Sequence, residues 1–68
     1  MDFGDYLRTK RKEKDLSLQE VSNDSGVSIA QISRIETGNR GMPKPETIKK
    51  LAPALGVTYE ELMARAGY

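Results

Sequence analysis

Apolar residues recur along the chain at three- and four-residue spacings, the period of a helix that is buried on one side. Phe3 and Leu7 predict a first helix over about residues 2–14. Ile32 and Ile35 give a later helix the same inward stripe. The apolar face of a fourth helix consists of Ile48, Leu51, Ala52 and Leu55. Alternation with a period of two residues, typical of strands, is absent, so the pattern predicts an all-α domain.

Start and stop signals divide this pattern into five short helices. Three serine or threonine residues each precede a glutamate or glutamine by three positions, as in a capping box. These pairs are Ser17 with Glu20, Ser28 with Gln31, and Thr58 with Glu61. Gly26, Gly38 and Gly56 supply the flexible residue at which helices commonly end. The second and third helices are therefore expected over about residues 17–25 and 28–37, and the fifth over about residues 58–67.

Proline residues mark the fourth helix. Residues 39–44 have the composition of a loop, and Pro45 suits the first helical position because its missing N–H is not needed there. Pro53 lies inside the same helix, where it removes a hydrogen bond. We therefore expect the fourth helix to kink or to fray early.

Residues 17–37 predict two short helices joined by a tight turn at Gly26, which is the arrangement of a helix-turn-helix unit. The outward positions of the second of these helices carry small side chains, which let a helix approach base edges in the DNA major groove. Arg34, on the same side, offers a two-pronged donor to guanine. An ordinary helical hairpin satisfies part of these requirements, so the residues alone leave both interpretations open.

Composition removes several classes of function. The 68 residues include neither cysteine nor histidine, which excludes a disulfide scaffold, a thiolate nucleophile, an imidazole base and the usual zinc sites. We expect no metal, no cofactor, no small-molecule substrate and no catalysis. The length allows one domain, over residues 1–68. No secretion signal and no membrane span are visible, so we expect a cytoplasmic protein without a membrane partner.

The net charge of +1, from 11 basic and 10 acidic residues, conceals two basic groups. The first is Arg8, Lys10, Arg11, Lys12 and Lys14, opposed by Glu13. The second is Arg34, Arg40, Lys44, Lys49 and Lys50, opposed by Glu36 and Glu46. A basic face of this kind is typical of nucleic-acid binding, and an ordinary solvated helix surface is the alternative.

Several blocks of sequence, in order, resemble phage repressor and Cro-type (XRE-like) helix-turn-helix domains. They are LSLQEV at residues 16–21, SGVS at 25–28, ISRIETG at 32–38, PETI at 45–48, LAPALGVT at 51–58 and EL at 61–62. The similarity extends over about residues 3–63. It implies a compact, lambda-repressor-like domain of five helices. It also implies a transcription regulator, in most cases a repressor, that binds double-stranded operator DNA as a homodimer on an inverted repeat.

The resemblance assigns base contacts to the third helix and phosphate contacts to residues around it. The base-contacting positions are Ile29, Ala30, Ser33 and Arg34. The phosphate-contacting positions are Ser17, Ser28, Arg11, Lys10, Asn39 and Arg40, with Lys12 as a further diffuse attractor. In the resembled family a basic residue at position 11 often pairs with the acid at position 36, which would join the first helix to the third and orient the guanidinium for a phosphate.

Each assignment has a structural alternative. Ser17 and Ser28 are required as helix caps with or without DNA. Ile29 packs either on a thymine methyl group or against Val27 and the turn. Ser33 has a base contact or no role, and Arg34 reads a base or pairs with an acid on its own helix. Lys10, Lys12 and Arg40 have the alternative of an ordinary solvated face.

Other positions depart from the family or concern assembly. Leu18 replaces a glutamine that contacts DNA in some members, so we expect it to pack against the core instead. Met42, Tyr59 and Met63 are interpreted as core or rim residues, and the alternative is that Tyr59, Leu62 and Met63 lie on a dimer surface. The sequence leaves open whether the domain is complete or is the amino-terminal part of a longer regulator.

Two other classes of function compete with DNA binding. A protein-interaction module, such as an antitoxin or a component of a phage switch, would use the groove beside the third helix to bind another protein. Steep loss of binding with added salt distinguishes phosphate contacts from apolar docking. An enzyme is disfavoured by the lack of catalytic side chains.

Overall fold

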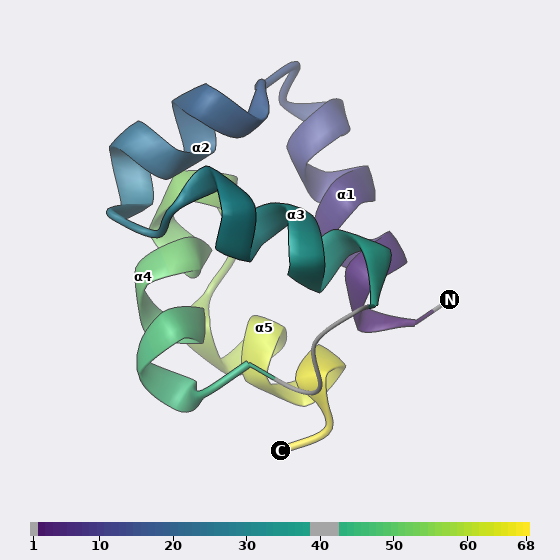
Figure 1. Ribbon diagram of the computed structural model, residues 1–68. Coiled ribbons are helices and arrows are strands. Elements are labelled where there is room, and N and C mark those ends of the chain that lie inside the picture. Colours follow the sequence, from purple (N-terminus) through teal and green to yellow (C-terminus); the bar gives the residue numbers. More distant parts are fainter. Residues whose placement is uncertain (1, 39–42) are drawn as a thin grey trace.

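The computed structural model describes residues 2–38 and 43–68 and shows an arrangement of α-helices with no strand in that part of the chain (Figure 1). The helices are α1 (Phe3–Glu13), α2 (Leu18–Ser25), α3 (Ile29–Thr37), α4 (Pro45–Leu55) and α5 (Tyr59–Ala66). The predicted all-α class and the five predicted helices are confirmed.

The predicted caps define the ends of these helices. The Oγ of Ser17 accepts from the Glu20 backbone N–H at 3.1 Å, and Glu20 Oε1 accepts from the Ser17 N–H at 2.9 Å, so this capping box is complete. Ser28 and Thr58 each make the forward half of the same motif, accepting at 3.1 and 3.0 Å from the residue three positions ahead. Glu61, the expected return partner of Thr58, instead accepts a hydrogen bond from Tyr6 on α1.

Every helix contributes at least one nearly fully buried residue to a single core. The largest of these side chains are Leu7, Val21, Ile32, Ile48, Leu51 and Leu62. Ile35, Ala52 and Leu55 are buried beside them, as their spacing predicted. Leu18 is partly buried against the same cluster, which confirms that it packs.

The arrangement of the helices leaves one side of α3 open. Helix α3 packs against α1 and α2, while α4 packs against α2 and α5. Figure 1 shows α3 crossing the front of the molecule, with α1 and α2 above it and α4 and α5 behind and below. A β-carbon on Gly4 would lie 2.5 Å from the Ile35 carbonyl oxygen, so this glycine permits the close approach of α1 to α3.

The expectation of early fraying at Pro53 is wrong. Helix α4 continues through Pro53 to Leu55 and ends at Gly56, which is left-handed with φ 71°. Pro53 is exposed, so its ring lies on the solvent side, and its carbonyl accepts from the Gly56 N–H at 3.2 Å. One lost hydrogen bond close to the helix end does not unwind a helix whose opposite face is buried.

None of the described helices is both long and apolar enough to cross a membrane.

Candidate nucleic-acid interface

The turn between α2 and α3 has the geometry that a helix-turn-helix requires. Gly26 ends α2 with φ 78°, and its N–H donates to the Ser22 carbonyl at 2.8 Å. Val27 then turns inward and is 5% exposed, while its N–H donates to the Ser25 Oγ at 3.1 Å. Ser28 begins α3 immediately afterwards. The two helices are thus held at a fixed angle by one left-handed glycine and one buried valine.

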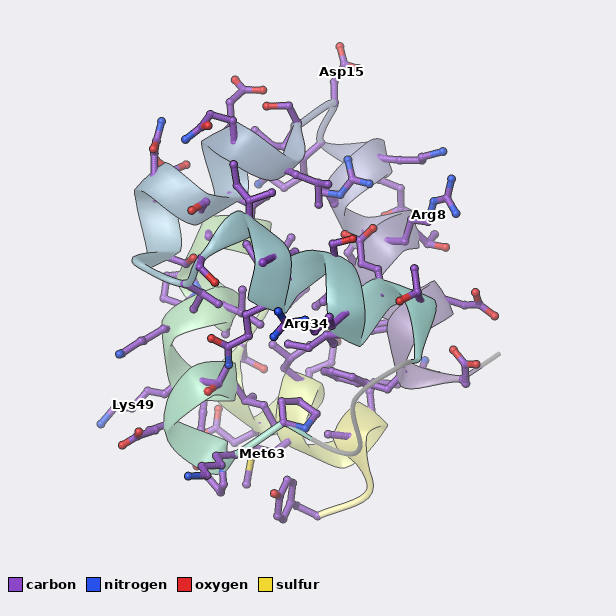
Figure 2. All side chains as sticks on the ribbon, viewed as in Figure 1. Arg8, Asp15, Arg34, Lys49 and Met63 are labelled. Carbon is purple, nitrogen blue, oxygen red and sulfur yellow. The ribbon has the colours of Figure 1, made fainter. Side chains whose placement is uncertain are left out.

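Helix α3 has one buried edge and one accessible face. Ile32 and Ile35 are 0% and 4% exposed and anchor the helix in the core. The four positions predicted to contact bases lie away from that edge: Ile29, Ala30 and Arg34 are exposed and Ser33 is half-buried. Figure 2 shows Arg34 on the side of α3 that faces the viewer. Small side chains therefore flank one long cation on the accessible face.

The structure bears on the alternatives for two of these positions. Ile29 is 38% exposed although its neighbour Val27 is buried, so part of the side chain is accessible and both of its alternatives stay open. Within residues 2–38 and 43–68 the ion pairs are Lys10 with Glu13 and Arg11 with Glu36, so Arg34 is not held by an acid on its own helix. Their contacts with bases stay a prediction.

The amino termini of α2 and α3 differ in their ability to receive a phosphate. At α2, the Glu20 carboxylate occupies the Ser17 N–H, and hydrogen bonds from the Ser17 backbone and side chain hold the pKa of Glu20 below its ordinary value. At α3, the first turn carries no acid, and Ser28 uses its hydroxyl only to cap Gln31. A free helix amino terminus attracts anions, whereas a carboxylate already placed there competes with them. Ser28 is therefore the stronger of the two predicted phosphate contacts.

Arg11 joins α1 to α3 and to the segment before α2. Its Nε and Nη2 donate to the Glu36 carboxylate at 2.7 and 3.0 Å, and its Nη1 donates to the Leu16 carbonyl at 2.9 Å. The pair that the family resemblance implied is confirmed. The hydrogen bond from Glu36 raises the pKa of Arg11 above its ordinary value, so the guanidinium stays charged. With only 13% of its side chain exposed, Arg11 acts first as a structural clamp between α1 and α3.

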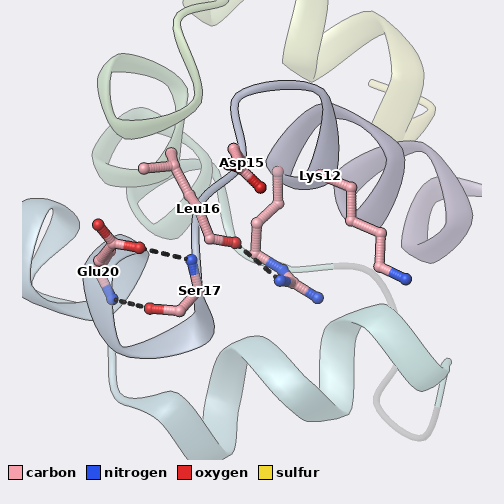
Figure 3. A pocket seen from close by; sticks show the side chains of 6 residues that line it. Lys12, Asp15, Leu16, Ser17 and Glu20 are labelled. Carbon is pink, nitrogen blue, oxygen red and sulfur yellow. Dashed lines mark hydrogen bonds between the residues drawn. The ribbon is translucent and has the colours of Figure 1, made fainter.

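A shallow hollow lies between the end of α1 and the start of α2. Figure 3 shows both hydrogen bonds of the Ser17 capping box on one side of it and the Lys12 side chain on the other. The hollow is lined by Arg11, Lys12, Asp15, Leu16, Ser17 and Glu20. Four of these six side chains are charged, two of them positively and two negatively. A phosphate that reached Ser17 would pass between these charges.

Lys10 lies on a different side of α1 from the clamp. Its Nζ is 3.4 Å from the Glu13 carboxylate and 5.6 Å from the centre of the Tyr6 ring. Tyr6 in turn donates to Glu61 on α5 at 2.5 Å. Lys10 therefore belongs to the α5 side of the helix, which weakens its case as a phosphate contact.

Sequence reasoning did not single out Arg8, which lies on the α3 side of α1. Gly4 and Arg11 both lie against the carboxyl end of α3. Arg8 follows Gly4 by four residues and precedes Arg11 by three. Residues at that spacing share one helix face. Arg8 is exposed, and Figure 2 shows its guanidinium pointing away from the helix. The spacing of residues 4, 8 and 11 is the signal that could have identified it.

The remaining predicted positions divide into two groups. The positions outside the described residues are Asn39, Arg40 and Met42. Of the three residues suggested for a dimer surface, Leu62 is 0% exposed and is a core residue, so that suggestion is wrong for Leu62. Tyr59 is 37% exposed, and Met63 is half-buried and packs partly against the core, so for these two residues a place on a dimer surface stays a prediction.

Comparison with known proteins places the same segments in one family. A model of the helix-turn-helix family matches residues 7–62. The HTH-type transcriptional repressor RghR of Bacillus subtilis (strain 168) is 58% identical over 66 residues, which are 97% of this chain and 49% of RghR. The transcriptional repressor RstR of the cryptic phage CTXphi, from Vibrio cholerae, is 39% identical over 62 residues, which are 91% of this chain and 55% of RstR. The chain spans about half the length of these two relatives.

The fold is similar to that of a regulator solved on DNA. The crystal structure of SinR, the master regulator for biofilm formation, in complex with DNA superimposes with a TM-score of 0.82. The aligned region is 30% identical and covers 90% of this chain and 97% of the SinR chain.

Proposed function

Because this chain belongs to the helix-turn-helix family, we propose that it is the DNA-binding domain of a transcription regulator that reads double-stranded DNA with α3. The observation that carries the proposal is the division of α3 into a buried edge at Ile32 and Ile35 and an accessible face that includes the exposed cation Arg34, which forms no ion pair within residues 2–38 and 43–68. A helix of this kind enters the major groove without moving its anchoring side chains.

The residues on and around α3 have separate roles in this proposal. Arg34 donates to a guanine edge, Ile29 packs on a thymine methyl group, and Ala30 and Ser33 let the helix approach closely. Ser28 and the first backbone N–H groups of α3 bind a phosphate. Arg8 and Lys12, on the exposed part of α1, attract the DNA backbone without regard to sequence.

The biological action follows from the relatives as well as from the site. RghR and RstR are both named transcriptional repressors, so we propose repression by occupancy of an operator. A single small domain covers a limited DNA surface, roughly 600–1,000 Å² for modules of this size, so we further propose that two copies bind an inverted repeat. We propose that the activity of this domain is DNA binding alone, without catalysis. We also propose that it takes place in the cytoplasm.

Selection from random duplex DNA at low and at high salt, followed by sequencing, tests the proposal. We expect enrichment of an inverted repeat whose half-sites are about one helical turn apart, with total retention falling as salt rises. Retention without sequence preference would contradict reading by α3. Absence of binding at every salt concentration would favour a surface for another protein.

A further inference from the structure

Asp15 is the one non-glycine residue with a positive φ in the part of the chain that the structure describes, at 58°. It follows the C-cap of α1, where its N–H donates to the Lys12 carbonyl at 2.9 Å and the Leu16 N–H donates to the Arg11 carbonyl at 3.0 Å. The left-handed conformation costs free energy for any residue with a β-carbon, although aspartate tolerates it better than most. Glycine is the residue that this turn favours.

The charge of Asp15 is unfavourable to the fold as well. A carboxylate at the carboxyl end of a helix meets the negative end of the helix dipole. The side chain is exposed, and none of the ion pairs among the described residues includes it. Figure 2 shows it projecting from the turn, away from the body of the molecule. Among the described residues, no ion pair of Asp15 offsets the free-energy cost of its left-handed backbone or of its charge at the end of α1.

Its position is next to the cations that face DNA in the proposed complex. Asp15 shares the hollow between α1 and α2 with Arg11, Lys12 and Ser17 (Figure 3). A negative charge there lowers the positive potential that the end of α1 presents to a phosphate backbone. Glu20, whose carboxylate caps α2, adds a second negative charge on the opposite side of Ser17.

We propose that Asp15 is a negative determinant of DNA affinity, which limits how strongly the domain is retained on DNA of any sequence. This inference rests on the proposed function. Because the carboxylate acts through charge on phosphates and not on bases, its effect is the same for every duplex and is screened by salt.

The test compares wild type with Asp15→Asn, Asp15→Gly and Glu60→Gln on one duplex of arbitrary sequence, over a series of salt concentrations. Glu60 is an exposed acid on α5 and is not among the residues that line the hollow, so its variant removes the same charge from a different helix. We expect both Asp15 variants to bind about two- to fourfold more tightly at low salt, with the gain disappearing as salt rises, and Glu60→Gln to change affinity much less.

The outcomes separate this inference from the function on which it rests. If wild type binds and the Asp15 variants bind no more tightly, the inference is wrong and the proposed function stands. An equal gain in Glu60→Gln would assign the effect to net charge alone and also overturn it. If no variant binds duplex DNA at any salt concentration, both fail.

Discussion

Arg11 on α1 and Glu36 on α3 form an ion pair with two hydrogen bonds, of 2.7 and 3.0 Å, that is almost withdrawn from solvent. The side chains are 13% and 7% exposed. The pair fixes the carboxyl end of α3 against α1, so the fold and the proposed DNA interface depend on the same contact.

Removing one partner of this pair should destabilise the domain strongly. Glu36→Ala leaves the guanidinium with only the Leu16 carbonyl as partner, and we expect a loss of roughly 2 kcal/mol in the free energy of unfolding. Urea denaturation measures the loss. Glu36→Gln retains one acceptor and should lose less. Equal stability of wild type and Glu36→Ala would show that the pair is not a clamp.

Gly4 tests the closeness of α1 and α3 independently. In Gly4→Ala the new β-carbon would meet the backbone carbonyls of Ile35 and Glu36 at 2.5 and 2.6 Å, and backbone cannot rotate away as a side chain can. We expect a loss of about 1–3 kcal/mol, despite the better helix propensity of alanine. Lys12→Ala, on the exposed side of the same helix, should stay within about 0.5 kcal/mol of wild type. A more stable Gly4→Ala would contradict the packing.

Replacement of Asp15 should raise the stability of the domain, in contrast to Glu36→Ala and Gly4→Ala. Asp15→Gly removes both the left-handed strain and the unfavourable charge at the end of α1. We expect a gain of about 0.5–1 kcal/mol in the free energy of unfolding, reduced by the greater freedom of glycine in the unfolded chain. Thermal or urea unfolding detects it. A less stable variant would show that the carboxylate has a structural partner after all.

Tyr6 links α1 to α5 in a pH-dependent way. Burial, and then the hydrogen bond to Glu61, raise the pKa of Tyr6 to about 12. Because this pKa lies above the ordinary value of 10.0, the contribution of Tyr6 to stability is complete below pH 10 and is lost as the pH rises towards 12. An absorbance titration should show a tyrosinate step near pH 12 that Tyr6→Phe abolishes. Persistence of that step in the variant would assign it to another residue.

The sequence predicted what depends on local chemistry. Ser17, Ser28 and Thr58 begin helices, and Gly26, Gly38 and Gly56 end them, because a cap is decided by a few adjacent residues. The inward stripes were equally accessible, since burial follows helical spacing. The Arg11–Glu36 pair was reached only through the resemblance to a family, because 25 residues separate its partners.

The features that sequence analysis missed depend on contacts between distant segments. Glu61 fits a capping box, yet its side chain accepts from Tyr6, 55 residues away. Lys10 and Arg8 are two positions apart in one basic run, so helical spacing already directs them to different sides of α1, and the packing of α1 between α3 and α5 decides which of them lies beside α3. Charge counted along the sequence therefore identified the basic helix without identifying which of its residues lie beside α3.

Sequence-specific binding requires that the accessible face of α3 reads bases. The most direct test repeats the duplex selection with Arg34→Ala and with Arg8→Ala. We expect Arg34→Ala to lose preference at one base pair in each half-site, about 1–3 kcal/mol of discrimination, whereas Arg8→Ala weakens binding to all sequences alike. An unchanged preference in Arg34→Ala, with the protein still folded and bound, would contradict the reading of bases by α3.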